Sequence, residues 1–315
     1  MKHKLRFIVI LFVTLFTFEG YSQYMFEYGG SAGIANYLGE IGGKEKERRD
    51  FISDMKLAKT RQSLSGFVRY KFSRRFYVKG ELMYFRISGD DKLSTNPARN
   101  ARNLSFVNDM FDLTTQGQFV FYENTDLGSD YRFRLAFRAY IGVGVGAFYS
   151  NPKAKNAAGE MVALRPLETE GVTYKAFGIN LPATMGFHFT YRKKHRFGWE
   201  LNWRTTFTDY LDDVSQGWGD PSKMTAEGVA MSNRTPELDP DLFAESPGFL
   251  NNFGFDKIMN PNNKRGDPSH NDSYMTMNFS YSYILRGKSS FYRSRYGSFF
   301  NKRGRSKMRK IRAKF

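Results

Sequence analysis

Apolar and polar residues alternate along eight segments of the chain. From Phe197 to Thr208, aromatic and aliphatic residues at every second position oppose charged, amide and hydroxyl residues. Strict alternation of this kind is typical of strands with one apolar and one polar face. In one segment the alternation loses its phase near Met83, where we expect a β-bulge. The segments are 25–38, 62–72, 76–88, 110–122, 132–149, 177–192, 197–208 and 275–285.

The connections between these segments alternate in length. The long ones are 40–61, 89–109, 150–174 and 210–272, and the short ones are 73–75, 124–131 and 193–195. A soluble β-sandwich has no reason to place its long connections at one end, whereas a membrane barrel has brief periplasmic turns and extended outer loops. We therefore expect an all-β fold, an eight-stranded antiparallel up-and-down transmembrane β-barrel with long extracellular loops. Side chains fill a lumen of this size, so we expect no pore.

The N-terminus has the order of a secretory signal peptide. Three basic residues precede the apolar stretch Phe7–Phe18, and small residues follow before Gln23. The alternative is an uncleaved membrane anchor. It is disfavoured because the apolar stretch has 12 residues, whereas a spanning helix needs about 17–25. We divide the chain into a signal peptide (1–22), an outer-membrane barrel (23–286) and a basic tail (287–315). An even number of strands then places both mature termini in the periplasm.

Composition narrows the class of protein further. The mean hydropathy of −0.54 excludes a polytopic helical membrane protein, since each helical span needs about 20 consecutive apolar residues. The absence of cysteine excludes disulfides, thiolate metal sites and cysteine nucleophiles. Aromatic residues make up 17% of the chain and gather near the short connections, as in the girdles at a lipid–water boundary.

Charge is unevenly distributed along the chain. The formal net charge is +17, and residues 287–315 contain 11 basic and no acidic residues. Loop 210–272 has the opposite sign, with 11 acidic and five basic residues. We expect the tail and the short turns to form a periplasmic face that binds either a partner protein or anionic outer-membrane lipids. Nucleic acid is not an expected partner of an exported barrel. The expected partner-binding residues are Arg74, Arg75, Lys193, Lys194, Arg196, Arg293, Arg295, Tyr296, Phe299, Phe300, Lys302, Arg303 and Arg305.

Charged residues also fall on the polar faces of the segments. Inside a barrel these side chains would neutralise one another in a packed polar core, which is a structural role rather than a sign of transport. The expected lumen network consists of Arg69, Lys71, Lys79, Glu81, Arg134, Arg138, Arg192, Glu200 and Arg204.

One cluster of residues in the sequence is a candidate for catalysis. Asp209, Asp212 and Asp213 follow the seventh segment, and His270 precedes the eighth. Such a cluster could activate water, hold Ca²⁺ through its carboxylates, or end a strand in a solvated loop. We favour the solvated loop, and therefore expect no enzymatic activity, no catalytic or metal-binding residues and no cofactor.

Three stretches carry a resemblance to a known family. Residues 28–40, 102–106 and 208–215 resemble the PorG-type component of the type IX secretion system, and the likeness spans most of 24–286. The resemblance implies an accessory barrel that ties a large periplasmic ring, built from a lipoprotein and its partner subunit, to the outer membrane. The alternative is a surface-exposed barrel that binds a ligand or a cell through loop 210–272.

Overall fold

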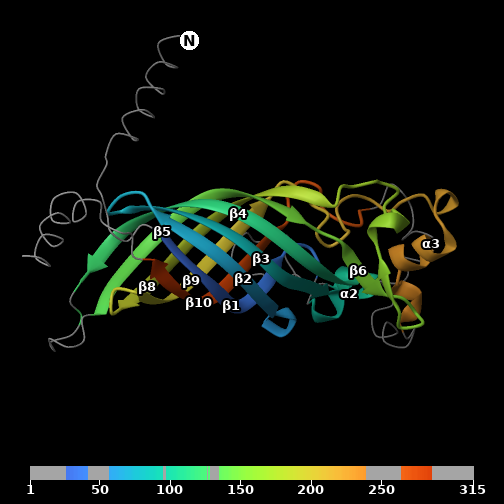
Figure 1. Ribbon diagram of the computed structural model, residues 1–315. Coiled ribbons are helices and arrows are strands. Elements are labelled where there is room, and N and C mark those ends of the chain that lie inside the picture. The colour runs from blue at the N-terminus through green and yellow to red at the C-terminus, as the bar shows by residue number, and fades with distance from the viewer. Residues whose placement is uncertain are drawn as a thin grey trace, which may run out of the picture.

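Eight long strands close into an antiparallel barrel (Figure 1). The computed structural model describes residues 26–41, 57–94, 97–125, 127, 135–238 and 264–285. The barrel strands are β1 (Phe26–Leu38), β2 (Arg61–Lys71), β3 (Phe76–Asp90), β4 (Ser105–Asn124), β5 (Leu135–Tyr149), β8 (Phe177–Tyr191), β9 (His195–Thr206) and β10 (Ser273–Leu285). Each strand pairs with its neighbour along the chain, and β1 pairs with β10 to close the sheet. The predicted all-β, eight-stranded up-and-down barrel is confirmed.

The long connections fold over one end of the barrel, which we call the cap (Figure 1). The described cap residues are 39–41, 57–60, 91–94, 97–104, 150–176, 207–238 and 264–272. Their short elements are η2 (Leu57–Lys59), η3 (Asp91–Leu93), α2 (Pro97–Arg102), β6 (Pro152–Lys155), β7 (Met161–Ala163), η4 (Arg165–Leu167), η5 (Pro221–Lys223), α3 (Ala226–Ser232) and η6 (Thr235–Glu237). Within the described ranges, no helix is long and apolar enough to cross a membrane.

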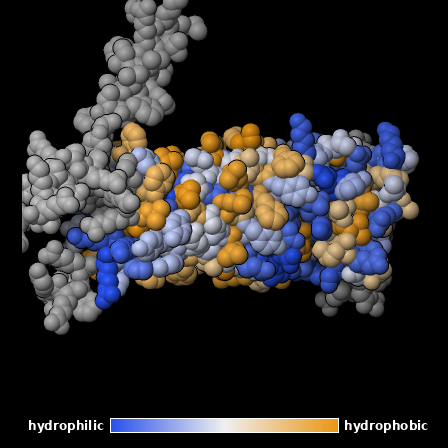
Figure 2. Space-filling model, viewed as in Figure 1, coloured by the Kyte–Doolittle hydropathy of each residue, from blue (hydrophilic) through white to orange (hydrophobic). Residues whose placement is uncertain are grey.

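The outer surface of the strands is apolar. Large hydrophobic side chains that alternate with the inward residues stay exposed, for example Leu64 (63%), Val143 (71%) and Phe177 (73%). On the face shown in Figure 2, hydrophobic side chains gather over the strands, and hydrophilic ones gather over the cap. We call this band of outward side chains the apolar belt. Water disfavours so much exposed apolar surface, so the belt requires an apolar surrounding.

The inner surface of the barrel changes character along its length. Charged side chains fill the half near the short turns, whereas the half near the cap is filled by a hydrophobic cluster that includes Met83, Phe85, Ile87 and Met110. The expectation that the whole lumen face is polar is therefore wrong for the cap half. Along β3 the inward residues change from charged at Glu81 to apolar at Met83. The two faces of the strand then no longer differ in polarity, which explains why the alternation in the sequence is lost near Met83.

The β-bulge expected near Met83 is absent from the β2–β3 and β3–β4 ladders, whose registers are continuous. A register shift occurs instead between Val120 and Tyr122, where β4 pairs with β5. Strands β3 and β4 are also longer than predicted, because their apolar inward residues near the cap hide the alternation. The connection expected at 89–109 is accordingly shorter in the structure, at 91–104.

A glycine on β5 makes room for the packed lumen. A Cβ atom on Gly144 would lie 2.2 Å from the carbonyl oxygen of Thr115 and 2.9 Å from Cγ of Gln116. Real Cβ atoms do not approach other atoms so closely, so a side chain here would displace the neighbouring strand. The glycine leaves this space to the buried side chain of Gln116.

Replacing Val143 with arginine tests which surface faces lipid. Val143 lies at the middle of β5 on the apolar belt. In phospholipid vesicles we expect Val143→Arg to lower the free energy of unfolding by about 2–4 kcal/mol, because the charge sits near the bilayer midplane. Leu285→Arg, at the end of β10, should cost less than about 1 kcal/mol. Urea titrations in vesicles measure both, and equally small losses would show that the belt does not contact hydrocarbon.

Candidate functional site: a plugged barrel with two different ends

A first charged group fills the lumen near the short turns. Glu27 of β1 accepts a hydrogen bond from Nη1 of Arg69 at 2.6 Å and one from Oγ of Ser282 at 2.9 Å. Arg196 of β9 also binds the Glu27 carboxylate. All three ionised side chains are buried. One carboxylate from the first strand therefore joins two guanidinium groups from other strands.

A second group crosses the middle of the lumen. Nζ of Lys79 lies 2.6 Å from Oε1 of Glu200 and 3.0 Å from Oε1 of Glu81. The hydroxyl of Tyr140 donates to Oε2 of Glu200 at 2.6 Å. These contacts link β3, β5 and β9 across the barrel, so paired polar side chains occupy the lumen at this level.

A third group separates the charged half from the hydrophobic cluster. Arg204 is fully buried, and its Nη1 lies 2.5 Å from Oδ2 of Asp112, while its Nη2 lies 3.3 Å from Oε2 of Glu81. The hydroxyl of Tyr274 donates to the same Asp112 oxygen at 2.9 Å.

The three groups balance in charge. Together they contain four basic residues (Arg69, Lys79, Arg196 and Arg204) and four acidic residues (Glu27, Glu81, Asp112 and Glu200). Neutrality matters because an unpaired charge in this enclosed space would cost several kcal/mol. We call these eight residues the lumen network.

The structure places most of the expected lumen residues inside the barrel, with one correction. Arg69, Lys79, Glu81, Glu200 and Arg204 belong to the lumen network. Lys71 and Arg138 are half-buried at the mouth, where Arg138 lies 2.5 Å from Glu123. Arg192 is exposed in the turn after β8, with its guanidinium 5.1 Å from the Tyr191 ring centre, so its assignment to the lumen is wrong. Arg134 lies outside the described residues.

Sequence reasoning missed three members of the lumen network. Glu27 and Asp112 stand at the alternate positions of their strands that point inward. Counting every second residue along each strand would have identified both. Arg196 was assigned to the exposed periplasmic face, which is wrong because it is buried and binds Glu27. The tight turn ends at Lys194, and β9 begins at His195, two residues before the predicted segment 197–208, so Arg196 is already inside the strand.

Four other expected partner-binding residues lie at the short-turn end. Arg74, Arg75, Lys193 and Lys194 are exposed in the two tight turns, and Arg192 joins them. We call these five residues the basic rim. The expected tail residues Arg293, Arg295, Tyr296, Phe299, Phe300, Lys302, Arg303 and Arg305 lie outside the described residues.

The cap contains buried carboxylates. Asp212 and Asp272 both contact the hydroxyl of Tyr37, at 2.6 and 2.7 Å. Both contacts have the Tyr37 hydroxyl as the donor, so the two carboxyl groups share its single proton. Burial raises the pKa of Asp212 to about 7, and the nearby Glu40 carboxylate adds to the shift. The carboxyl group of Asp212 is therefore expected to titrate near neutral pH.

Asp213 points to a different set of partners. It accepts hydrogen bonds from Oγ1 of Thr169 at 2.5 Å and from the hydroxyl of Tyr174 at 2.6 Å. Arg265 lies between Asp213 and Glu170, with Nη1 2.9 Å from the Glu170 carboxylate. Burial raises the pKa of Asp213 to about 6, although Arg265 opposes the shift.

The cluster of three aspartates with His270 that the sequence suggested does not assemble. Asp209, Asp212 and Asp213 are buried, so the expectation of a solvated loop is wrong. His270 is exposed and lies 3.5 Å from Asp267. In the part of the chain that the structure describes, no group of three or more histidine or acidic side chains could hold a metal ion.

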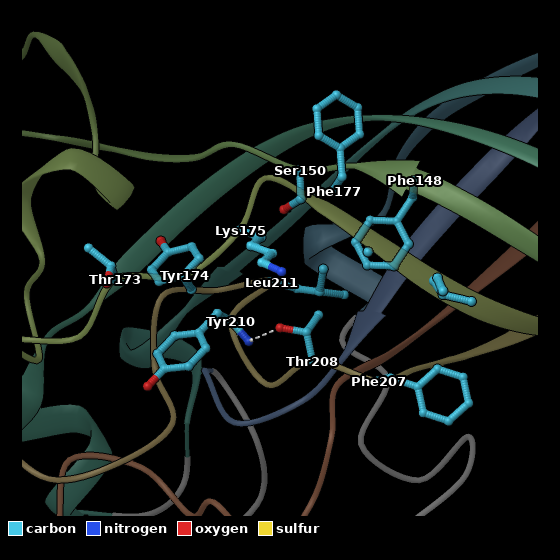
Figure 3. Close-up of a pocket in the computed structure, with 12 residues that line it drawn as sticks. Phe148, Ser150, Thr173, Tyr174, Lys175, Phe177, Phe207, Thr208, Tyr210 and Leu211 are labelled. Atoms are coloured by element: carbon cyan, nitrogen blue, oxygen red, sulfur yellow. Dashed lines mark hydrogen bonds between the residues drawn. The ribbon is translucent and has the colours of Figure 1, made fainter.

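Two cavities open on the cap. The first, of about 330 Å³, lies where β8 begins and β9 ends, and we call it the rim pocket (Figure 3). Its lining includes Phe148, Lys175, Phe177, Phe207 and Tyr210. The second, of about 520 Å³, lies between the loops 166–171 and 216–225, and we call it the cap pocket.

A family model described as a domain of unknown function, DUF6089, matches residues 4–224, which is more than half of the chain. The chain belongs to the DUF6089 family. The DUF6089 match spans β1 to β9 and extends into the cap. No curated protein matches this DUF6089 chain significantly.

Solved structures similar to this DUF6089 chain include two crystal structures of Ail, the attachment invasion locus protein of Yersinia pestis. The structure in complex with the heparin analogue sucrose octasulfate is 10% identical, with 83% of this chain and 99% of Ail covered and a TM-score of 0.33. The structure of Ail itself is also 10% identical, with 82% and 98% covered and a TM-score of 0.31.

Proposed function

We propose that this DUF6089 protein is a non-enzymatic outer-membrane barrel that anchors or organises the periplasmic ring of the type IX protein secretion machinery. The apolar belt supports the membrane location, because outward hydrophobic side chains are stable in lipid and unfavourable in water. In this arrangement the short turns and both termini of the mature chain lie in the periplasm, and the cap lies outside the cell.

The filled lumen favours an anchoring role over the transport of solutes. An ion pair crosses the barrel between β3 and β9, a hydrogen bond joins β5 to it, and the hydrophobic cluster follows toward the cap. A solute would have to break buried ion pairs and displace packed apolar side chains. The barrel is therefore best suited to present its two ends to other molecules.

The basic rim is the observation that carries the proposal. Its five cations are exposed, and the one ion pair they make within the described residues is that of Arg74, 3.6 Å from Glu123, with 84% of the Arg74 side chain exposed. Strand β10 ends at the same rim, and residues 287–315 with their 11 basic residues follow it in sequence. A periplasmic partner with an acidic surface would meet both sets of charges together.

Pull-down experiments with three variants test this role. One variant lacks 287–315, one reverses the rim charges (Arg74, Arg75, Lys193 and Lys194 to Glu), and a control reverses Lys153 and Lys155 in the cap. We expect the first two to lower recovery of the ring lipoprotein and its partner subunit by at least about tenfold and to impair secretion. The control should behave as wild type.

Two outcomes would contradict the anchoring role. Normal ring recovery and secretion in both the tail deletion and the rim variant would remove the basic face from the mechanism. Weaker binding of the rim variant to anionic vesicles with normal ring recovery would assign these cations to membrane lipids instead.

The cap pocket favours one alternative, a barrel that captures an external ligand or cell. The buried Trp218 and the half-buried Leu167 and Met224 line this pocket together with Glu168 and Glu170. A Met224→Arg change would fill the cavity, and under this alternative it should abolish surface binding and leave secretion intact. The anchoring role predicts that the same change has no effect on ring recovery.

A further inference from the structure

The rim pocket lies at the border between the apolar belt and the cap. Phe177 is the first residue of β8, and Phe207 directly follows the last residue of β9. Their side chains are 73% and 62% exposed and point away from each other on two sides of the pocket (Figure 3). Ile179, which is 58% exposed, continues the same lining into the belt. One side of the pocket is therefore continuous with the surface that would face hydrocarbon.

A single cation lies in the lining of this pocket. Lys175 is exposed and makes no ion pair with any residue that the structure describes. Hydroxyl groups of Ser150, Thr173 and Thr208 line the same cavity. Phosphate oxygens accept hydrogen bonds from hydroxyls and pair with an ammonium group, so this lining suits an anionic phosphate group.

The wall of the pocket on the cap side is fixed in place. Tyr174 and Tyr210 stack with their ring centres 4.6 Å apart and their planes 7° from parallel. The Tyr174 hydroxyl donates to the buried Asp213, and the backbone N–H of Tyr210 donates to Oγ1 of Thr208 at 3.3 Å. A preformed wall lowers the ordering cost of binding. The volume of about 330 Å³ is within the range of small-molecule pockets.

We propose that the rim pocket binds the phosphate-bearing headgroup of a membrane lipid, with Lys175 on the phosphate and the acyl chains against Phe177 and Phe207. The anionic headgroup and the acyl chains match the two kinds of lining that meet here. This inference rests on the membrane location in the proposed function, and it does not depend on the periplasmic ring. With the cap outside the cell, the lipid belongs to the outer leaflet.

Native mass spectrometry of the detergent-solubilised full chain tests this site. The probes are dipalmitoyl phosphatidic acid, dipalmitoyl phosphatidylcholine and inorganic phosphate. We expect wild type to prefer phosphatidic acid, and Lys175→Gln to weaken that binding by about fivefold. Lys155→Gln, an exposed cap lysine outside the pocket, is the matched control and should bind as wild type. Phe207→Ser should weaken both lipids, because it removes an acyl-chain contact.

Each other outcome overturns the proposal. Equal phosphatidic acid binding by Lys175→Gln and Lys155→Gln would show that Lys175 does not hold the headgroup. No preference over phosphatidylcholine would exclude recognition of the anionic phosphate. Competition by inorganic phosphate at equal concentration would make a free anion the ligand. Normal ring recovery with the tail and rim variants would overturn the ring proposal and leave the lipid site standing. An absence of destabilisation by Val143→Arg would remove the membrane location and overturn both proposals together.

Discussion

Replacing Arg204 with methionine is expected to lower the free energy of unfolding by about 3–5 kcal/mol, the usual cost of removing one partner from a buried ion pair. Arg204 is fully buried, and the change leaves the Asp112 carboxylate and one Glu81 oxygen without their cation. Water cannot readily solvate these oxygens, because the hydrophobic cluster closes the lumen on the cap side.

Urea titration in phospholipid vesicles, followed by tryptophan fluorescence, measures this loss. Arg74→Met is the matched control, since Arg74 is exposed and its loss should cost less than about 0.5 kcal/mol. Adding Asp112→Asn to Arg204→Met should recover part of the stability, because the stranded carboxylate becomes neutral. A loss below about 1 kcal/mol for Arg204→Met would show that the lumen is hydrated enough to screen its charges.

The stability of the cap is expected to fall as pH rises from about 5 to 8. The pKa of Asp212 is about 7 in the folded chain, whereas an unperturbed aspartate titrates near 3.9. The folded state therefore binds its proton more tightly than the unfolded state does. This contribution is fully present below about pH 4 and is lost as pH rises through 7. The expected loss for the cap is about 2 kcal/mol.

Hydrogen exchange of backbone amides around Asp212 measures this effect after correction for intrinsic exchange rates. Protection should decrease from pH 5 to 8 in wild type, and much less in Asp212→Asn, which stays neutral. Asp220→Asn is the control, because Asp220 is half-exposed and its hydrogen bonds with Ser222 lower its pKa. Unchanged protection across this range in wild type would show that Asp212 does not change its protonation between pH 5 and 8.

The barrel could be predicted from the sequence because its determinants are local. Alternation along each strand identified the outward side chains, and the lengths of the connections identified the two ends. The same reasoning failed where the inward residues become apolar, as at Met83 in β3, because alternation is visible only when the two faces differ in polarity. It also misassigned Arg196, because β9 begins two residues earlier than predicted and this residue therefore lies in the lumen and not in the turn.

The cap could not be predicted because its contacts join distant parts of the chain. Tyr37 contacts Asp212 and Asp272, which follow it by 175 and 235 residues. Arg102 binds the Asp91 carboxylate and also donates to the backbone carbonyl of Arg265. Nothing in the sequence near Asp212 indicates that it is enclosed, so a buried acid looked like one in a solvated loop.

The seam between β1 and β10 has a consequence for how the protein is made. Phe26 pairs with Leu285, so the first strand cannot find its second neighbour until nearly the whole chain has left the ribosome. Until then the growing sheet has two open edges, each able to recruit a foreign strand. Contacts this far apart form slowly. Both edges of the sheet therefore stay open to foreign strands until β1 pairs with β10.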